Sequence, residues 1–243
     1  MNTILTAHQP AYLPWLGLFH KIAIANAYVY LDNVQFEKNS FINRNKIKTA
    51  NGPIWLTVPI LLKGHMSKTI KETKINNIVN WQTKHLKSIE LNYKSTSYFN
   101  QYIGFFRDCC KREWTHLSDL NEYMLKWFLN ILNIKVKYYK MSEVEFEGKK
   151  SDLVLDMCKK LSADLYIFGE LGKDYVKQED FAEKDIKMYF QKYNHPVYPQ
   201  LYGDFISHLS IIDLLFNVGA EKALDIIMKG NITKQELRRM FSI

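Results

Sequence analysis

A short loop near the N-terminus holds the side chains best suited to chemistry. The loop runs from His8 to Trp15, and its two prolines fix the backbone angle φ at two positions. His8 and Gln9 can exchange protons or hydrogen bonds, while Tyr12 and Trp15 offer rings that stack on a base or a sugar. A stiff polar loop of this kind predicts a ligand site. The alternative is a structural loop whose prolines end a strand and whose rings cap the core.

Two further groups lie in the N-terminal third. Arg44 could hold a phosphate or a carboxylate through two parallel hydrogen bonds, with the Asn43 amide beside it. Asp32 and Gln35 could orient a hydroxyl, an amine or a metal-bound water. The alternatives are a surface arginine and an aspartate that stabilises a turn.

The C-terminal third holds the remaining candidates. His195, Tyr198 and Gln200 share one proline-stiffened segment, in which the imidazole could act as an acid or a base near neutral pH; a structured loop is the alternative. Ser210 and Asp213 lie on the polar stripe of an otherwise apolar helix, so a buried Asp213 would need a partner.

The elements around the first loop predict a parallel sheet. Residues 3–7 and 27–31 have the pattern of strands, and residues 16–25 have the pattern of the helix between them. Such a unit pairs its strands in parallel, and ligands bind beyond the carboxyl ends of parallel strands. His8 and Asp32 follow such ends, which favours catalytic roles for both.

The rest of the chain completes an α/β pattern. The turn pair Asn51-Gly52 predicts a β-hairpin over residues 43–60, and a helical insertion follows over about 80–132, with Asn80 as its first N-cap. The later elements expected are strands over 136–139, 165–168 and 187–191, a helix capped by Ser151-Asp152, a helix over 209–218 capped by Ser207, and a helix from 221 to about 229. We therefore expect one α/β domain over residues 1–243: a Rossmann-like, doubly wound, mostly parallel sheet with a β-hairpin and a helical insertion.

Composition restricts the partners and the compartment. The formal charge of +8 favours anionic partners, although much of the excess is lysine on polar faces. The sequence has no secretion signal and no run of about 18 apolar residues, so we expect neither export nor membrane insertion. Three cysteines without the spacing of zinc ligands fit a reducing cytoplasm. The motifs of serine hydrolases and zinc proteases are absent.

Six segments resemble the WbqC-like protein family. They are HQPAYLPWLGLFHKI (8–22), LDNVQF (31–36), NRNKIK (43–48), WLTVP (55–59), YNHPVYPQ (193–200) and LSIIDLLFNVG (209–219). The resemblance covers nearly the whole chain. In one motif, relatives usually have a serine before a glycine, whereas here Phe168 precedes Gly169; the later Gly172 and Tyr175 match, so a turn close to a ligand is still implied.

The resemblance implies a role in the biosynthesis of O-antigen or of another surface polysaccharide or glycoconjugate. A basic cytosolic enzyme with an anionic substrate would suit N-acylation of a nucleotide-linked amino sugar, with ATP or an activated acyl donor as the possible cofactor. The expected catalytic residues are His8, Asp32 and His195. The expected substrate-binding residues are Gln9, Tyr12, Trp15, Lys21, Gln35, Asn43, Arg44, Trp55, Gly172, Tyr175, Tyr198, Gln200, Ser210 and Asp213.

Two other functions remain open at this stage. The chain could be a non-catalytic module that binds a sugar nucleotide or a scaffold for polysaccharide assembly, or it could bind nucleic acid through its basic, aromatic-rich surface, which we expect less. The layout of strand, histidine-containing loop and helix is also that of adenylate-forming ligases of the pantothenate synthetase type, an analogy of fold alone. The similarity of residues 65–69 to the Lys-Met-Ser-Lys-Ser loop of such enzymes is interpreted as coincidence.

Overall fold

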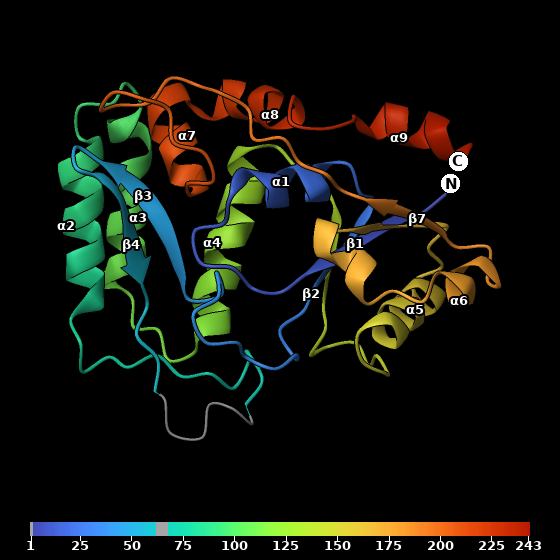
Figure 1. Ribbon diagram of the computed structural model, residues 1–243. Helices are drawn as coiled ribbons and strands as arrows, with labels where there is room; N and C mark the ends of the chain where they lie inside the picture. The colour runs from blue at the N-terminus through green and yellow to red at the C-terminus, as the bar shows by residue number, and fades with distance from the viewer. Residues whose placement is uncertain (1, 62–67) are drawn as a thin grey trace.

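A five-stranded parallel sheet forms the centre of the protein (Figure 1). The computed structural model describes residues 2–61 and 68–243. Residues 65–67 of the segment that was compared with the Lys-Met-Ser-Lys-Ser loop therefore lie outside the described residues. The strands are β1 (Ile4–His8), β2 (Ala27–Tyr30), β5 (Lys137–Lys140), β6 (Leu165–Phe168) and β7 (Lys187–Phe190). Their spatial order is β5-β2-β1-β6-β7, and every neighbouring pair is parallel. The predicted doubly wound, Rossmann-like α/β fold is confirmed.

The order of the strands contains one switch point. From β1 the chain proceeds to β2 and then β5 on one side, and only later returns to place β6 and β7 on the other side of β1. The connections therefore leave the central strand in opposite directions. Such a reversal opens a crevice at the carboxyl ends of the two central strands, where ligands of open α/β sheets bind. Here those strands are β1 and β6.

Helices cover both faces of the sheet. The alternation of side chains along β1 sends Leu5 and Ala7 into a core shared with α5 (Ser151–Lys160) and α6 (Gln178–Ala182), while Ile4 packs in a cluster with residues near the end of α1 (Leu16–Ala23) and from α9 (Lys234–Phe241). The termini lie close together beside β7 (Figure 1), where the Arg238 guanidinium reaches the backbone oxygen of Asn2.

The predicted hairpin and helical insertion form the other half of the molecule. The hairpin consists of β3 (Arg44–Thr49) and β4 (Gly52–Thr57), and the insertion consists of α2 (Trp81–Tyr93), α3 (Phe99–Lys111) and α4 (Leu117–Ile131). The Asn80 side chain accepts a hydrogen bond from the Thr83 amide, as an N-cap should. With α7 (Ile211–Val218) and α8 (Ala220–Met228), these elements share the largest core cluster.

Two predicted caps were wrong. The N-cap residue of helix α5 is Lys150, which has a φ of 51° and forms no side-chain cap. The Ser151 hydroxyl accepts a hydrogen bond from the Lys177 amide and does not cap the helix. Helix α7 is capped by Ser210, not Ser207, because His208 turns the chain with a φ of 58° and the Ser210 amide then bonds to the Lys46 carbonyl of the hairpin before the helix begins. Helix α9 was not predicted, although Thr233 and Glu236 form a capping box at its start.

Within the described residues, no helix has both the length and the apolar character needed to span a bilayer.

Candidate active site

A pocket of about 720 Å³ opens at the switch point, beyond the carboxyl ends of β1 and β6. Most of its lining comes from four parts of the chain. These are the end of β1 with the loop that follows, the first turns of α1, the segment from Phe168 to Tyr175 that includes the 3₁₀ turn η2 (Glu170–Asp174), and the segment after β7. Six of the residues expected from the sequence line it, namely His8, Gln9, Trp15, Lys21, Gly172 and Tyr175.

His8 is the last residue of β1 and presents one ring nitrogen as an acceptor. Its Nδ1 lies 2.6 Å from the Gln9 carbonyl oxygen, so Nδ1 carries the proton and Nε2 carries the lone pair. Burial, and next the charge of Lys21, lower the pKa of His8 to about 3. The free protein therefore holds His8 neutral at physiological pH, as a hydrogen-bond acceptor and not as an acid.

Lys21 is a buried cation in the wall of the same pocket. Its side chain is only 5% exposed, and its Nζ donates to the Ala7 carbonyl oxygen at 3.0 Å. Burial lowers the pKa of Lys21 to about 8. Among the described residues, no acidic side chain pairs with this ammonium, so an anionic ligand group would supply the missing partner.

The beginning of α1 adds to the positive character of this wall. The N-cap residue Trp15 forms no side-chain cap, and the helix dipole is positive at this end. Gln191 holds this end in place, since its Nε2 donates to the Gly17 oxygen at 3.0 Å and to His20 Nδ1 at 2.8 Å. His20 Nε2 in turn donates to the Ile232 oxygen, and burial lowers the pKa of His20 to about 4.

Three rings form an aromatic wall, defined here as Trp15, Tyr193 and His208. The Trp15 ring stacks on His208 with centroids 5.8 Å apart and meets Tyr193 edge-on at 5.5 Å. His208 has a positive φ of 58°, which few non-glycine residues adopt without local support. The Trp15 ring also lies against Gly17, where an added Cβ would be 2.2 Å from a ring carbon.

Replacement of Gly17 by alanine should therefore displace the aromatic wall. The new methyl group cannot coexist with the Trp15 ring, so the ring must leave its stack on His208. We expect a changed tryptophan fluorescence spectrum and at least a tenfold loss of affinity for dTDP-glucose, equivalent to about 1.4 kcal/mol. Gly104→Ala in α3, where a Cβ meets no atom within 4 Å, is the control and should change neither. An unaltered Trp15 environment in Gly17→Ala would contradict this packing.

The far wall is apolar where the resemblance implies a hydroxyl. Phe168 ends β6 with its ring stacked on Phe190 at a centroid distance of 5.1 Å. Gly172 must be small because a Cβ there would lie 2.7 Å from the Phe168 side chain. Glu37, Glu170 and Asp174 are exposed around the pocket, which makes its rim acidic and its interior basic.

Asp32 and Gln35 do not line this pocket. Asp32 is fully buried at the end of β2, where its two carboxylate oxygens accept from the Ser142 amide at 2.9 Å and the Ser142 hydroxyl at 2.6 Å. The carboxylate thereby joins the carboxyl ends of β2 and β5. This is close to the structural alternative for Asp32, an aspartate that stabilises a turn. Gln35 pairs with Thr69 in an isolated bridge.

Arg44, Asn43 and Trp55 lie on the hairpin, outside the pocket lining. The Arg44 guanidinium stacks 4.4 Å above the Trp55 ring and donates to the Asn39 oxygen. Trp55 is 44% exposed, whereas the Asn43 amide is buried and donates to the Val58 oxygen at 2.9 Å. None of the three residues lines the pocket that contains His8.

Tyr198, Gln200 and Asp213 belong to a buried polar network around Lys48. Asp213 is fully buried and accepts from the Tyr93 hydroxyl at 2.8 Å and the Tyr198 hydroxyl at 3.0 Å. Lys48 Nζ donates to Gln200 Oε1 at 3.1 Å and to a backbone oxygen. Burial raises the pKa of Asp213, and its two tyrosine bonds and the Lys48 charge oppose this rise. This network joins β3, α2 and α7, so the partner expected for Asp213 is present.

Ser210, Tyr12 and His195 are also placed away from the floor of the pocket. Ser210 caps α7, and the Tyr12 hydroxyl lies 2.9 Å from His85 Nδ1. His195 donates from Nδ1 to the Pro196 oxygen, and burial lowers its pKa to about 4. His195 does not line the pocket, but its ring contacts two residues that do, His208 at a centroid distance of 5.1 Å and Tyr193 at 6.3 Å.

The pocket contains several residues that the sequence analysis missed. Gln191, His208 and Glu37 come from irregular segments or strand ends and belong to no chemical motif, and Tyr193 lies in the segment 193–200 but was not expected to bind a ligand. Gln191 could have been found, because it follows β7 and so lies at the same sheet edge as His8. The thiols are not candidate nucleophiles: burial raises the pKa of Cys109 to about 12 and that of Cys110 to about 11. No metal-binding group of three or more His, Cys, Asp or Glu side chains occurs in the part of the chain that the structure describes.

Comparison with known proteins identifies relatives without a described activity. The model of the WbqC-like protein family matches residues 9–224. The chain is 33% identical over 215 residues to the uncharacterized protein Rv1507c of Mycobacterium tuberculosis, an alignment that covers 88% of this chain and 93% of that protein. No solved structure matches significantly.

Proposed function

The chain belongs to the WbqC-like protein family, and from this premise we propose that it is a transferase or ligase that N-acylates a nucleotide-linked amino sugar. Membership of this family suggests a role in polysaccharide biosynthesis. The cytoplasm, as expected from the cysteine content, is the proposed compartment. The observation that carries the proposal is the pocket at the switch point, with buried Lys21 and the acceptor nitrogen of His8 in one wall.

Lys21 and the start of α1 suit the diphosphate of a sugar nucleotide. A phosphate gains both from the helix dipole and from a desolvated ammonium, and a pocket of about 720 Å³ falls in the size range of small-molecule sites. The acidic rim suits the other end of the same substrate. Glu37, Glu170 and Asp174 would attract the protonated amine of an amino sugar.

His8 suits the acceptor amine in the acylation step. The amine nitrogen attacks the carbonyl carbon of an activated acyl donor, a C–N bond forms, and the leaving group departs with its electron pair. His8 Nε2 would accept a hydrogen bond from the attacking amine and take its proton as the intermediate collapses. After burial, the charge of Lys21 is the second cause that lowers the pKa of His8, and a bound diphosphate would offset this second cause.

A turnover assay tests the proposal. The protein is incubated with ATP, an amino acid and a dTDP-amino sugar, and the products are examined by mass spectrometry for an acylated sugar and for AMP or ADP. We expect acylated sugar from the wild-type protein and from Lys87→Met, an exposed control on α2, and at least a hundredfold less from His8→Phe, which lacks the acceptor nitrogen. Sugar-nucleotide binding without turnover would favour a non-catalytic module. Salt-sensitive binding of single-stranded DNA alone would favour a nucleic-acid function.

The pH dependence of binding follows from Lys21. Its ammonium holds the diphosphate only while protonated, and the pKa in the free protein is about 8. Affinity for dTDP-glucose, which has no amine, should therefore be constant below this pH and fall about tenfold per unit above it. Calorimetric titrations from pH 6 to 9 measure the effect. Affinity that stays level up to pH 9 would show that Lys21 does not contact the anion.

A further inference from the structure

The hairpin leaves the outer edge of β4 open. A two-residue turn joins Thr49 to Gly52, so hydrogen-bonded and non-hydrogen-bonded pairs alternate along the hairpin from that point. By this alternation the backbone groups of Trp55 and Thr57 point away from β3. The bond from the Val58 amide to the Asn43 oxygen at 2.8 Å fits the same alternation.

The two edges of the hairpin differ in how many of their backbone groups form hydrogen bonds. On the β3 edge, the Lys48 amide donates to the Tyr93 hydroxyl and the Lys46 oxygen accepts from the Ser210 amide. On the β4 edge, only the Thr57 oxygen is engaged, by His85. Among the described residues, nothing hydrogen-bonds to the Trp55 amide, the Trp55 oxygen or the Thr57 amide. An edge with unpaired backbone groups is a template for another strand.

A groove runs along this open edge, between β4 and α2. It consists of two hollows of about 310 and 570 Å³ that share Ile54 and Ser88 in their linings. Each hollow has lining residues from β4 and from α2. The six residues of β4 extend over roughly 20 Å, so the groove has the length of a strand of about six residues.

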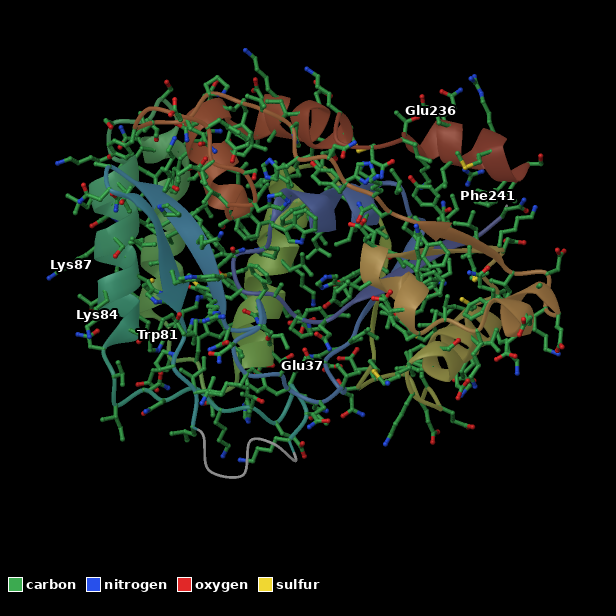
Figure 2. The ribbon with its side chains drawn as sticks, in the orientation of Figure 1. Glu37, Trp81, Lys84, Lys87, Glu236 and Phe241 are labelled. Carbon is green, nitrogen blue, oxygen red and sulfur yellow. The ribbon has the colours of Figure 1, made fainter. Side chains whose placement is uncertain are left out.

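The groove is apolar and basic. Ile54 is 37% exposed and Leu91 is 66% exposed, and both contribute to its lining. Lys84 and Lys87 also line it, and both extend from α2 toward solvent (Figure 2). Because neither lysine forms a salt bridge with another described residue, an acidic partner would find two free cations here.

We infer that the β4 edge binds an extended acidic segment of a partner protein by strand addition. The segment's backbone pairs with the amide and oxygen of Trp55 and with the amide of Thr57, its acidic side chains face Lys84 and Lys87, and its apolar side chains contact Ile54 and Leu91. A second copy of this chain is disfavoured as the occupant, since it would bring like charges together in a protein of net charge +8. A nucleic acid would leave the strand-edge amides and carbonyls without matching partners.

Selection from a library of random decapeptides displayed on phage tests this inference. We expect acidic, strand-forming peptides to be enriched and their affinity to fall at least tenfold in Thr57→Pro, which removes one outward amide without breaking a bond to β3. Lys84→Glu/Lys87→Glu should cause a similar loss. Thr57→Ser and the distant charge control Lys159→Glu/Lys222→Glu should bind as the wild-type protein does.

If Thr57→Pro fails to fold, a measurement on the wild-type protein still tests the inference. Nuclear magnetic resonance should show the Trp55 and Thr57 amides shifting and becoming protected from exchange when an enriched peptide binds. Failure to enrich any peptide that depends on both Thr57 and the lysines would overturn the inference. So would enriched peptides that leave the two amides unchanged, or single-stranded DNA binding that the lysine substitutions abolish while no peptide binds.

Discussion

Replacement of Lys21 by methionine should weaken the binding of dTDP-glucose about a hundredfold, equivalent to about 2.7 kcal/mol. The substitution keeps the buried aliphatic volume and removes the ammonium, so a diphosphate at the start of α1 loses its charge-assisted bonds. The fold should persist, because methionine carries none of the desolvation cost that lowers the pKa of Lys21.

Lys87→Met is the matched control for this substitution. Lys87 is exposed on α2, so its replacement changes the net charge equally without touching the pocket. Calorimetry should give wild-type affinity for Lys87→Met, and urea denaturation should give similar midpoints for both variants. Equal affinities for Lys21→Met and Lys87→Met would place the anion elsewhere.

Of the substitutions discussed, Asp213→Ala should lower the stability of the fold most, by about 3–5 kcal/mol in the free energy of unfolding. Asp213 accepts from the Tyr93 and Tyr198 hydroxyls and offsets the nearby Lys48 charge. Its removal leaves two buried hydroxyls without their acceptor and takes away a negative charge that offsets the charge of Lys48. Urea denaturation measures the loss.

Asp225→Ala provides the comparison, since Asp225 is an exposed aspartate on the neighbouring helix α8. It should change stability by less than about 0.5 kcal/mol. Asp213→Asn should fall between the two because its amide oxygen keeps one acceptor. If Asp213→Ala were as stable as Asp225→Ala, the network would not be what holds β3, α2 and α7 together.

The sequence was most informative where the pattern is local. The apolar runs at β1, β2 and β6 and the turn at Asn51-Gly52 each depend on a few adjacent residues, and the structure has them within about two residues of their predicted bounds. Caps that depend on distant contacts were missed. Ser210 begins α7 because the chain turns at His208 and the hairpin then holds the Ser210 amide, and the residues near Ser210 in the sequence do not show that distant contact.

The same distinction applies to the candidate site. Six expected residues lie in the pocket because they lie at or after the predicted ends of β1 and β6, which are adjacent in the sheet. They are His8, Gln9, Trp15, Lys21, Gly172 and Tyr175. Asp32 also follows a strand, but its strand β2 lies on the far side of β1 from β6, and Ser142 occupies its carboxylate. Strand order decides which strand ends share a pocket, and the pattern of a single sequence does not contain that order.

A crystal structure with a bound dTDP-amino sugar would show whether the pocket between β1 and β6 binds the substrate. We expect diphosphate density within hydrogen-bonding distance of Lys21 Nζ and the start of α1, with the sugar amine toward His8 Nε2. Ligand density on the outer face of the hairpin, beside Arg44 and Trp55, with the pocket between β1 and β6 empty, would contradict this expectation.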